Sequence, residues 1–366
     1  MSAAGRCAIV GGGLAGFIAY ATLLHGGVQP DEITVFGNSL DPAATWRIRA
    51  AAIRQRQMRS ESDGHCLPTS FPGLAVRAAR KGNVQPLFDT VRNRYHPTVG
   101  EFLEHVAERR ERTGWDRRVK LARVERITAV DGGFELESHG VFRHVLVAPG
   151  QPGLEVPVAL ADDPRVVHAY EPHDFADRVA IVGAGMAAAT EWLNALSTGA
   201  HVTSVRRREP ERQPLNVPRT LLSRRGLVRF HATEPVERAA MLRRLLSPSY
   251  PSGPTWDEPL ALAAREGRFR VSAEVDGETQ IVCATGFRRG FGYDPLLARL
   301  VSEHSLETHE RWIVITPDCT VPALTDTTRT LALAGAPAQW AYPAADTLVG
   351  ARYASHAFLR QVKRRD

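Results

Sequence analysis

Residues 8–18, AIVGGGLAGFI, join a short apolar run to a helix-like segment through a glycine turn. Glycines at 11, 13 and 16 have the GxGxxG spacing. In this pattern the first glycine permits a tight turn, the second lets the backbone approach a pyrophosphate, and the third lets the helix pack closely on the strand. Free N–H groups at the helix start favour the phosphate charge. The stretch therefore predicts a β-α-β unit with a nucleotide-binding turn at Gly11, Gly13 and Gly16.

A second copy of this stretch, AIVGAGMAAAT, occupies residues 180–190. Gly183, Gly185 and Ala188 fill its three positions. Each copy lies between an apolar run and an alanine-rich helical segment, and a further strand follows, EITVF at 32–36 and HVTSV at 201–205. One glycine turn is a weak signal, but two copies in the same context predict two dinucleotide-binding folds.

The residues that follow these second strands distinguish one nucleotide from another. An acid there binds a ribose 2′-hydroxyl, whereas arginine accommodates a 2′-phosphate. Arg206, Arg207 and Arg208 follow HVTSV, which favours NADPH over NADH at the second turn. In the first copy, the residue after Phe36 is glycine instead of an acid. We expect Asn38 or Ser39 to serve the ribose there.

The order of the segments predicts how the two folds are connected. Short strands with a DGG hairpin turn at 131–133 end in APG at 148–150, and strands over 268–284 end in ATG at 284–286. The chain then returns through LALAG at 331–335 to a final helix over 346–363. We predict an α/β protein with two Rossmann-like (three-layer ββα) dinucleotide-binding domains, the second inserted in the first. The expected domains are 1–160 with 280–366, and 161–279.

The intervening segments give weaker signals. A helix is expected over 98–113, because Val99, Phe102, Leu103 and Val106 form one apolar face. Residues 62–98 resemble a loop, residues 150–177 a linker, and residues 45–60 and 206–260 lack a clear period.

Composition excludes several functions. The net charge of +6 comes from arginines spread along the chain, which suits anionic cofactors better than nucleic acid. No apolar run reaches the ~18–20 residues that span a bilayer, and the first residues lack a signal-peptide pattern. We expect a cytoplasmic protein with no nucleic-acid or membrane partner. The four cysteines are far apart, so we expect neither a redox disulfide nor a metal site, and Cys7 and Cys283 are expected to be buried.

The whole plan resembles the two-dinucleotide-binding flavoproteins. VLVAPGQPG (145–153) and VCATGF (282–287) are similar to the crossing strands of that superfamily. Three further stretches resemble flavin-dependent N-hydroxylating and class B monooxygenases, namely MRSESDGHCLPTSFPGL (58–74), HPTVGEFLEHV (96–106) and ADTLVGARYASHAF (345–358). The cysteine pair of the disulfide reductase branch is absent.

The resemblance implies FAD at the first turn and NADPH at the second, so that 161–279 is the NADPH-binding domain. NADPH would reduce FAD, and O₂ would then be activated as a C4a-(hydro)peroxyflavin that oxygenates a small-molecule amine, another heteroatom or a ketone. Besides the two turns, the expected cofactor-binding residues are Asn38, Gly150, Arg206, Arg207, Arg208, Thr285, Gly286, Asp346, Thr347 and Leu348. The expected catalytic residues are Arg59, Ser60 and His65, and the expected substrate residues are Arg219, Gln339 and Trp340.

Two other functions remain open from the sequence. The same nucleotide sites would serve an FAD-dependent NADPH dehydrogenase or reductase that does not oxygenate. A non-catalytic flavoprotein is the third alternative, since the acid after Phe36 is missing. The sequence also leaves open the substrate, a homo-oligomer, and a substrate carried by a carrier protein.

Overall fold

The computed structural model describes residues 5–59, 62, 73–92 and 94–365.

The first glycine turn follows a strand of the larger of the two main sheets. The strand order is β3-β2-β1-β6-β5-β4, with β16 beside β6. β4 and β5 form the antiparallel hairpin expected at the DGG turn, and β1, β2, β3, β6 and β16 are parallel. The strands are β1 Gly5–Val10, β2 Ile33–Gly37, β3 Val119–Leu121, β4 Ile127–Val130, β5 Gly133–Leu136, β6 Gly140–Val147 and β16 Thr330–Leu333.

The second sheet is entirely parallel, in the order β12-β9-β8-β13-β7. Its strands are β7 Val166–His168, β8 Arg178–Val182, β9 His201–Val205, β12 Phe269–Ser272 and β13 Gln280–Cys283. All of them lie between β6 and β16 in the chain, which confirms the insertion of one nucleotide fold in the other. The linker expected over 150–177 was wrong at β7, because a three-residue strand is too short to show a period. Two small pairs complete the strands, β10 Glu211–Arg212 with β11 Ser249–Tyr250, and β14 Thr308–His309 with β15 Trp312–Ile313.

Some helices lie where the sequence predicts them, and several others were not predicted. Helix α5 is capped by Thr98 and Glu101, as a capping box. The loop expected over 62–98 was wrong at Leu74–Arg80 and Gln85–Val91, which form helices of seven residues, too short to show a period. Short helices also occupy the stretches without a clear period, and several helices begin with proline or with a serine cap. The helices are α1 Leu14–His25, α2 Ala44–Ala52, α3 Leu74–Arg80, α4 Gln85–Val91, α5 Val99–Thr113, α6 Met186–Ser197, α7 Arg219–Leu222, α8 Arg224–Ala232, α9 Pro235–Leu245, α10 Pro254–Arg265, α11 Pro295–His304 and α12 Leu348–Arg364.

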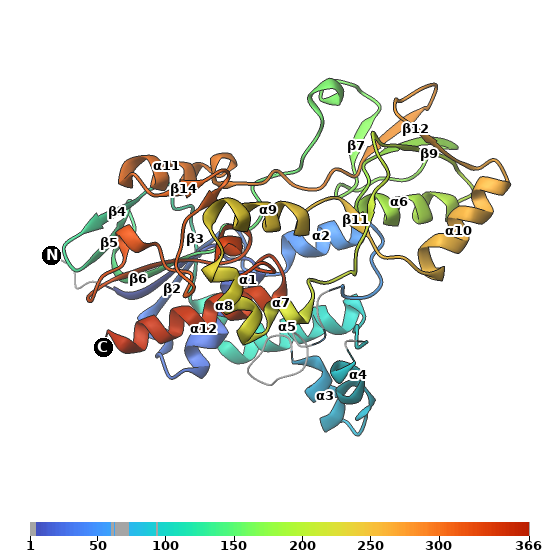
Figure 1. Ribbon diagram of the computed structural model, residues 1–366. Coiled ribbons are helices and arrows are strands. Elements are labelled where there is room, and N and C mark those ends of the chain that lie inside the picture. Colours follow the sequence, from blue (N-terminus) through green and yellow to red (C-terminus); the bar gives the residue numbers. More distant parts are fainter. Residues whose placement is uncertain (1–4, 60–61, 63–72, 93, 366) are drawn as a thin grey trace.

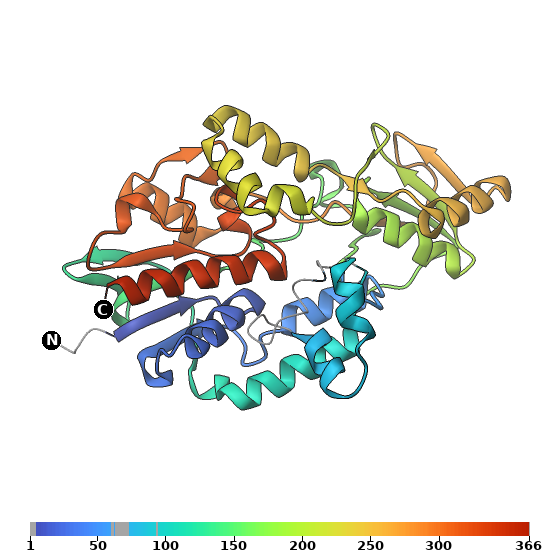
Figure 2. The same cartoon turned by 60° about the horizontal axis from the view of Figure 1, so that its bottom comes forward.

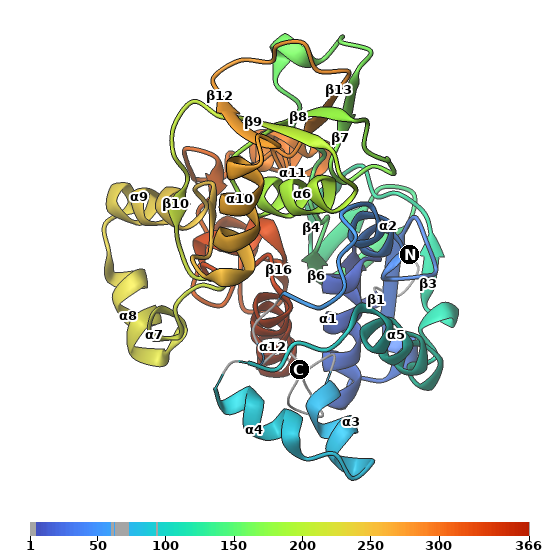
Figure 3. The same cartoon turned by 90° about the vertical axis from the view of Figure 1, so that its right-hand side faces the viewer.

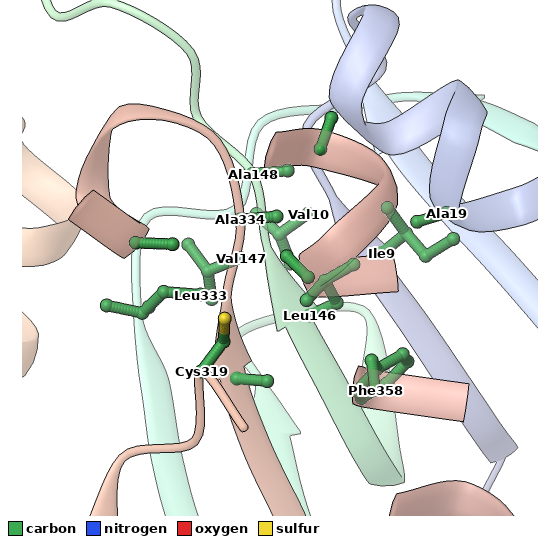
Figure 4. Packing of buried hydrophobic residues seen from close by; sticks show 14 of the residues in the cluster. Ile9, Val10, Ala19, Leu146, Val147, Ala148, Cys319, Leu333, Ala334 and Phe358 are labelled. Carbon is green, nitrogen blue, oxygen red and sulfur yellow. The ribbon is translucent and has the colours of Figure 1, made fainter. Parts of the chain in front are cut away.

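The main core forms where α1 and α12 pack beside β1, β6 and β16 (Figure 4). Ile9, Leu146, Leu333 and Phe358 are fully buried there, so burial of apolar surface fixes the final helix to the first sheet. Figure 2 shows α12 lying along this part of the molecule. Cys7 and Cys283 are buried, as expected.

The two sheets lie at opposite ends of the molecule, with α2 and α7–α9 between them (Figure 1). Figure 3 shows the second sheet at the top, α3 and α4 at the bottom, and α7–α9 and α2 on opposite sides between them. Phe230, Ala239 and Leu242, from α8 and α9, belong to the larger core although their place in the chain is within 161–279. Within the part of the chain that is described, no helix is long and apolar enough to cross a membrane.

Candidate functional site

The first glycine turn has the geometry that a dinucleotide needs. A β-carbon on Gly11, at φ +126°, would lie 2.0 Å from the carbonyl oxygen of Ala148. One on Gly16 would lie 1.9 Å from the carbonyl oxygen of Gly11, whereas one on Gly13 would meet no atom within 4 Å. Gly11 and Gly16 are therefore required by packing, and Gly13 leaves open space at the start of α1. This division of roles fits the approach of a phosphate to the backbone.

The missing acid after β2 has a steric explanation. A β-carbon on Gly37 would lie 2.8 Å from the Cα of Gly12, so the end of β2 touches the glycine turn directly. An acidic side chain does not fit at this position. Asn38 and Ser39 line the cavity beside the turn, as does Asp41, which accepts from the backbone N–H of Ala43 and pairs with Arg47.

The second turn repeats this arrangement in the other sheet. Gly183, at φ +137°, would place a β-carbon 2.6 Å from the carbonyl oxygen of Ala284. At Gly185 the nearest atom to such a carbon would be the Cα of Pro248, at 3.7 Å. Ala188 occupies the third position and is fully buried. Its β-carbon lies 3.5 Å from where a β-carbon on Gly183 would be. The second turn thus also combines one glycine required by packing with one, Gly185, where a β-carbon would make only ordinary van der Waals contacts.

The two crossing segments lie side by side. Leu154 and Phe287 form an antiparallel bridge, and the backbone N–H of Glu155 donates to the carbonyl of Gly286 at 3.0 Å. The Thr285 hydroxyl donates to the carbonyl of Glu155. The APG and ATG segments, distant in sequence, therefore meet between the two turns.

Both turns open into one cavity of about 1790 Å³. Of the described residues, eight arginines and five acids line it, which favours anionic ligands. It brings together many of the residues expected from the sequence: Gly11, Gly13, Asn38, Arg59, Gly150, Gly183, Gly185, Arg208, Thr285, Gly286, Asp346, Thr347 and Leu348. Gly16 and Ala188 lie behind the turns, where they pack helix on strand.

The three arginines after β9 diverge. The side chain of Arg206 is 10% exposed, pairs with Glu209 at 2.9 Å, and lies over the ring of Trp192. Arg207 is exposed and is not among the residues that line the cavity, whereas Arg208 is exposed and lines it. Arg208 is consequently the member of this group that is best placed to contact a phosphate in the cavity.

Replacing Arg208 by alanine is expected to lower the preference for NADPH over NADH about tenfold or more, because a charge-assisted hydrogen bond to a phosphate is lost. The measurement is the dissociation constant of each nucleotide for the purified protein. Arg207→Ala is the matched control and should leave the ratio unchanged. An unchanged ratio in Arg208→Ala would contradict the assignment.

A stacked column at the meeting point of the crossings was not anticipated from the sequence. Tyr170 stacks on Phe287 with ring centroids 4.8 Å apart, and the guanidinium of Arg49 lies 4.7 Å from the centre of the Phe287 ring. Tyr170, Phe287 and Arg49 all line the cavity, together with Arg59 and Arg289. Burial lowers the pKa of each of the three guanidinium groups, and burial raises the pKa of the Tyr170 hydroxyl.

These arginines favour an anionic ligand in the middle of the cavity. Among the described residues, no carboxylate lies within ion-pair distance of Arg49, Arg59 or Arg289. The Arg59 guanidinium donates to the Thr190 hydroxyl at 2.9 Å, which places it against α6. Partly desolvated cations that are not in direct ion-pair contact with a carboxylate attract negative charge strongly, although Asp346 offsets part of the charge of Arg289.

A small side chamber of about 40 Å³ opens beside the main cavity. Asp346, Arg289 and Gln339 line it. Asp346 is exposed to the cavity, but the protein around it still desolvates the carboxyl and raises its pKa, while Arg289 and a hydrogen bond from Gln339 oppose that rise. Thr347 caps α12, since its hydroxyl accepts from the N–H of Gly350 at 3.2 Å.

The other expected residues lie elsewhere. Arg219 donates to the carbonyls of Thr90 and Val91 at the end of α4 and is not among the residues that line the cavity. Trp340 is 1% exposed and packs near Trp312. Ser60 and His65 lie outside the described residues, and within those residues no group of three His, Cys, Asp or Glu could hold a metal ion. The roles expected for all four remain predictions.

The paired turns and the inserted sheet define a fold of two Rossmann-like domains, one inserted in the other. No family model and no curated protein matches the sequence. Three solved structures illustrate the likeness in fold. An ornithine hydroxylase from Pseudomonas aeruginosa has a TM-score of 0.70 and 16% identity over 98% of this chain and 99% of that one.

The second is an ornithine N-hydroxylase from Kutzneria sp. 744, with reduced FAD, NADP⁺ and L-ornithine, at a TM-score of 0.76 and 14% identity over 99% of each chain. The third is a bacillithiol disulfide reductase from Bacillus cereus, at 0.61 and 17% identity over 99% of each chain. At these identities the likeness is one of fold, and it confirms the fold class and the resemblance expected from the sequence.

Proposed function

We propose that this protein is an NADPH-dependent FAD monooxygenase that oxygenates a small molecule with O₂. The observation that carries the proposal is the single cavity that both glycine turns line, Gly13 and Gly185 included. Two nucleotides seated on the two turns would extend toward the same central space. The Kutzneria enzyme of the same fold contains FAD and NADP⁺ together, which supports this pairing.

The chain's own residues would bind the two nucleotides at opposite ends of the cavity. The N–H groups at the starts of α1 and α6 would bind the pyrophosphates, and those at the start of α12 would face the flavin. Arg208 would bind the 2′-phosphate, and Arg49, Arg59 and Arg289 would hold negative charge near the centre. When bound, the cofactors supply hydride transfer and the reaction of reduced flavin with O₂.

We keep 1–160 with 280–366 as the proposed FAD domain and 161–279 as the proposed NADPH domain. The side chamber at Asp346 and Gln339 is the proposed contact for substrate, because it adjoins the cavity at the start of α12. Arg59 remains the proposed catalytic residue among those described. The substrate is an amine, another heteroatom compound or a ketone.

A reductase is the second candidate, and the likeness to the bacillithiol disulfide reductase favours it. A cysteine-based disulfide reduction is a poor fit to the described residues. Cys7, Cys283 and Cys319 are all buried, and none of them lines the cavity. Burial also raises the pKa of Cys283 to about 11 and that of Cys319 to about 12, which keeps these thiols protonated and unreactive.

The experiment that separates the two candidates supplies ¹⁸O₂ to the FAD-loaded protein with NADPH and a panel of amines, thioethers and ketones. A monooxygenase is expected to place one ¹⁸O atom in a product and to consume one NADPH for each product formed. NADPH consumption that yields only reduced oxygen with every compound, alongside efficient reduction of an artificial electron acceptor, would favour the reductase.

A further inference from the structure

A buried ion pair joins the segment before β8 to α6. The His173 Nε2 lies 2.7 Å from the Glu191 Oε2, and the two side chains are 3% and 0% exposed. The other ring nitrogen, Nδ1, lies 2.7 Å from the carbonyl oxygen of Glu171. A carbonyl oxygen only accepts, so Nδ1 carries a hydrogen, and the Glu191 carboxylate takes the hydrogen on Nε2. The arrangement is that of a doubly protonated imidazolium.

The same carboxylate is linked to the end of α2. The Asn194 amide nitrogen donates to Glu191 Oε1 at 2.9 Å and to the carbonyl oxygen of Ile53 at 2.9 Å. Ile53 is the C-cap of α2, 141 residues away in the chain. The Asn194 side chain therefore ties α6 of the second fold to α2 of the first, and Glu191 joins Asn194 to His173.

The next residue after the cap adds a second tie. Arg54 adopts φ 50°, a conformation that glycine accepts more readily than arginine. Its side chain reaches the carbonyl of His173 at 3.4 Å and the carboxylate of Asp174 at 3.3 Å, and it lies 4.6 Å from the centre of the Phe175 ring. The local backbone of α2 is thus held in an uncommon conformation at the point where it meets the His173 segment.

Both tied helices line the shared cavity. α2 contributes Arg49 and Ala50, and α6 contributes Met186 and Ala187 directly after the second glycine turn. A shift of α6 relative to α2 would move the second turn away from the centre of the cavity. Buried polar pairs add little net stability compared with apolar packing, but they can define one geometry.

We infer that His173, Glu191 and Asn194 are positioning residues that hold α6 and the second glycine turn against α2, so that the two nucleotides of the proposed reaction meet. This inference rests on the proposed function. These residues lie behind the cavity wall and act through α6. Amide hydrogen exchange tests the contact between α6 and α2 without the reaction, and the rate of flavin reduction tests it during the reaction.

The test compares Asn194→Ala, which removes the link to Ile53, with Glu191→Gln, which removes the charge but keeps the shape. Ser197→Ala is the matched control, because its hydroxyl bonds only within α6, to the carbonyl of Asn194. The first measurement is amide hydrogen exchange in the FAD-loaded proteins. We call His173, Glu191 and Asn194 the clamp. In both clamp variants, the amides at 50–56 and 186–191 are expected to exchange faster, and those of β1 and β6 to exchange at the wild-type rate. The control should match the wild type throughout.

The second measurement is the anaerobic rate of flavin reduction by NADPH. The limiting rate is expected to fall about tenfold to a hundredfold in both clamp variants, because small misplacements of reacting groups slow a reaction strongly. The dissociation constant for NADPH should change less than about threefold, since the second turn itself is intact. Unchanged exchange, or a limiting rate within about twofold of the wild type, would overturn the inference. If NADPH does not reduce the flavin of the wild-type protein, the proposed function is overturned instead. Hydrogen exchange alone would then test whether these residues hold α6 against α2.

The pH profile gives a signature that a merely structural contact would not show. Burial lowers the pKa of His173, but hydrogen bonds to the Glu191 carboxylate and the Glu171 carbonyl outweigh it, so the pKa lies above its ordinary value. The charged clamp is present at lower pH and is lost as pH rises through that raised pKa. The reduction rate should therefore fall on the alkaline side, and Glu191→Gln should move that fall to lower pH. A profile that Glu191→Gln leaves unmoved would contradict the inference. The charged or titratable groups around the pair are Arg54, Arg59, Tyr170, Glu171 and Asp174.

Discussion

Gly16→Ala is expected to lose FAD and to lower the free energy of unfolding by about 3 kcal/mol. The new β-carbon would lie 1.9 Å from the carbonyl oxygen of Gly11. Gly11 has little room to move away, because its backbone packs closely on Ala148: a β-carbon built on Gly11 would lie 2.0 Å from the carbonyl oxygen of Ala148. Helix α1 would have to move off β1, which disrupts both the core and the turn. Urea unfolding and the flavin content of the purified protein measure the two losses.

Gly13→Ala separates binding from packing at the same turn. No atom lies within 4 Å of its β-carbon, and the residue has an ordinary φ of −82°. The free energy of unfolding should stay within about 0.5 kcal/mol of the wild type, while FAD affinity should fall about tenfold or more, because the methyl group occupies the path of the phosphate. If Gly13→Ala binds FAD as tightly as the wild type, the first turn does not seat the nucleotide.

Gly185→Ala is expected to weaken NADP⁺ binding about tenfold or more and to leave the FAD content unchanged. Its β-carbon would meet Pro248 at 3.7 Å, an ordinary contact, and its φ is −98°. The added methyl group would therefore leave the protein folded and would act on the ligand alone. A titration of the FAD-loaded protein with NADP⁺, followed by the flavin spectrum, gives the affinity.

Gly292→Ala is the matched control for this variant. A β-carbon on Gly292 would likewise cause no clash, since it would meet no atom within 4 Å, and Gly292 is exposed and is not among the residues that line the cavity. It should bind both nucleotides as the wild type does. Unchanged NADP⁺ affinity in Gly185→Ala would place the second nucleotide away from this turn.

The parts of the fold that sequence predicts best are those with strong local signals. β9 has the bounds expected for HVTSV, and β8 and α6 flank the second glycine turn as expected, because that turn separates a continuous apolar run from an alanine-rich helix. The short helices over 219–265 were missed, since none has a long apolar face of its own. Tertiary contact with the larger core stabilises α8 and α9.

In the candidate site, too, local sequence patterns were predicted, whereas contacts between distant residues were not. The glycine turns and the crossings are local patterns, and the structure brings them to one cavity. Arg49, Tyr170 and Phe287 come from three segments that are distant in the chain, so no pattern of sequence spacing predicts that they are in contact. Arg206 and Arg208 are nearly adjacent in sequence, yet one pairs with Glu209 over Trp192 and the other lines the cavity. The reason for Gly37 is visible only in its contact with Gly12.

The most direct test of the central claim, that two nucleotides meet in this cavity, is anaerobic mixing of the FAD-loaded protein with NADPH. The account predicts that the visible flavin absorbance disappears with one NADPH for each FAD, and more slowly with NADH. A flavin that stays oxidised with NADPH, although dithionite reduces it, would contradict the account.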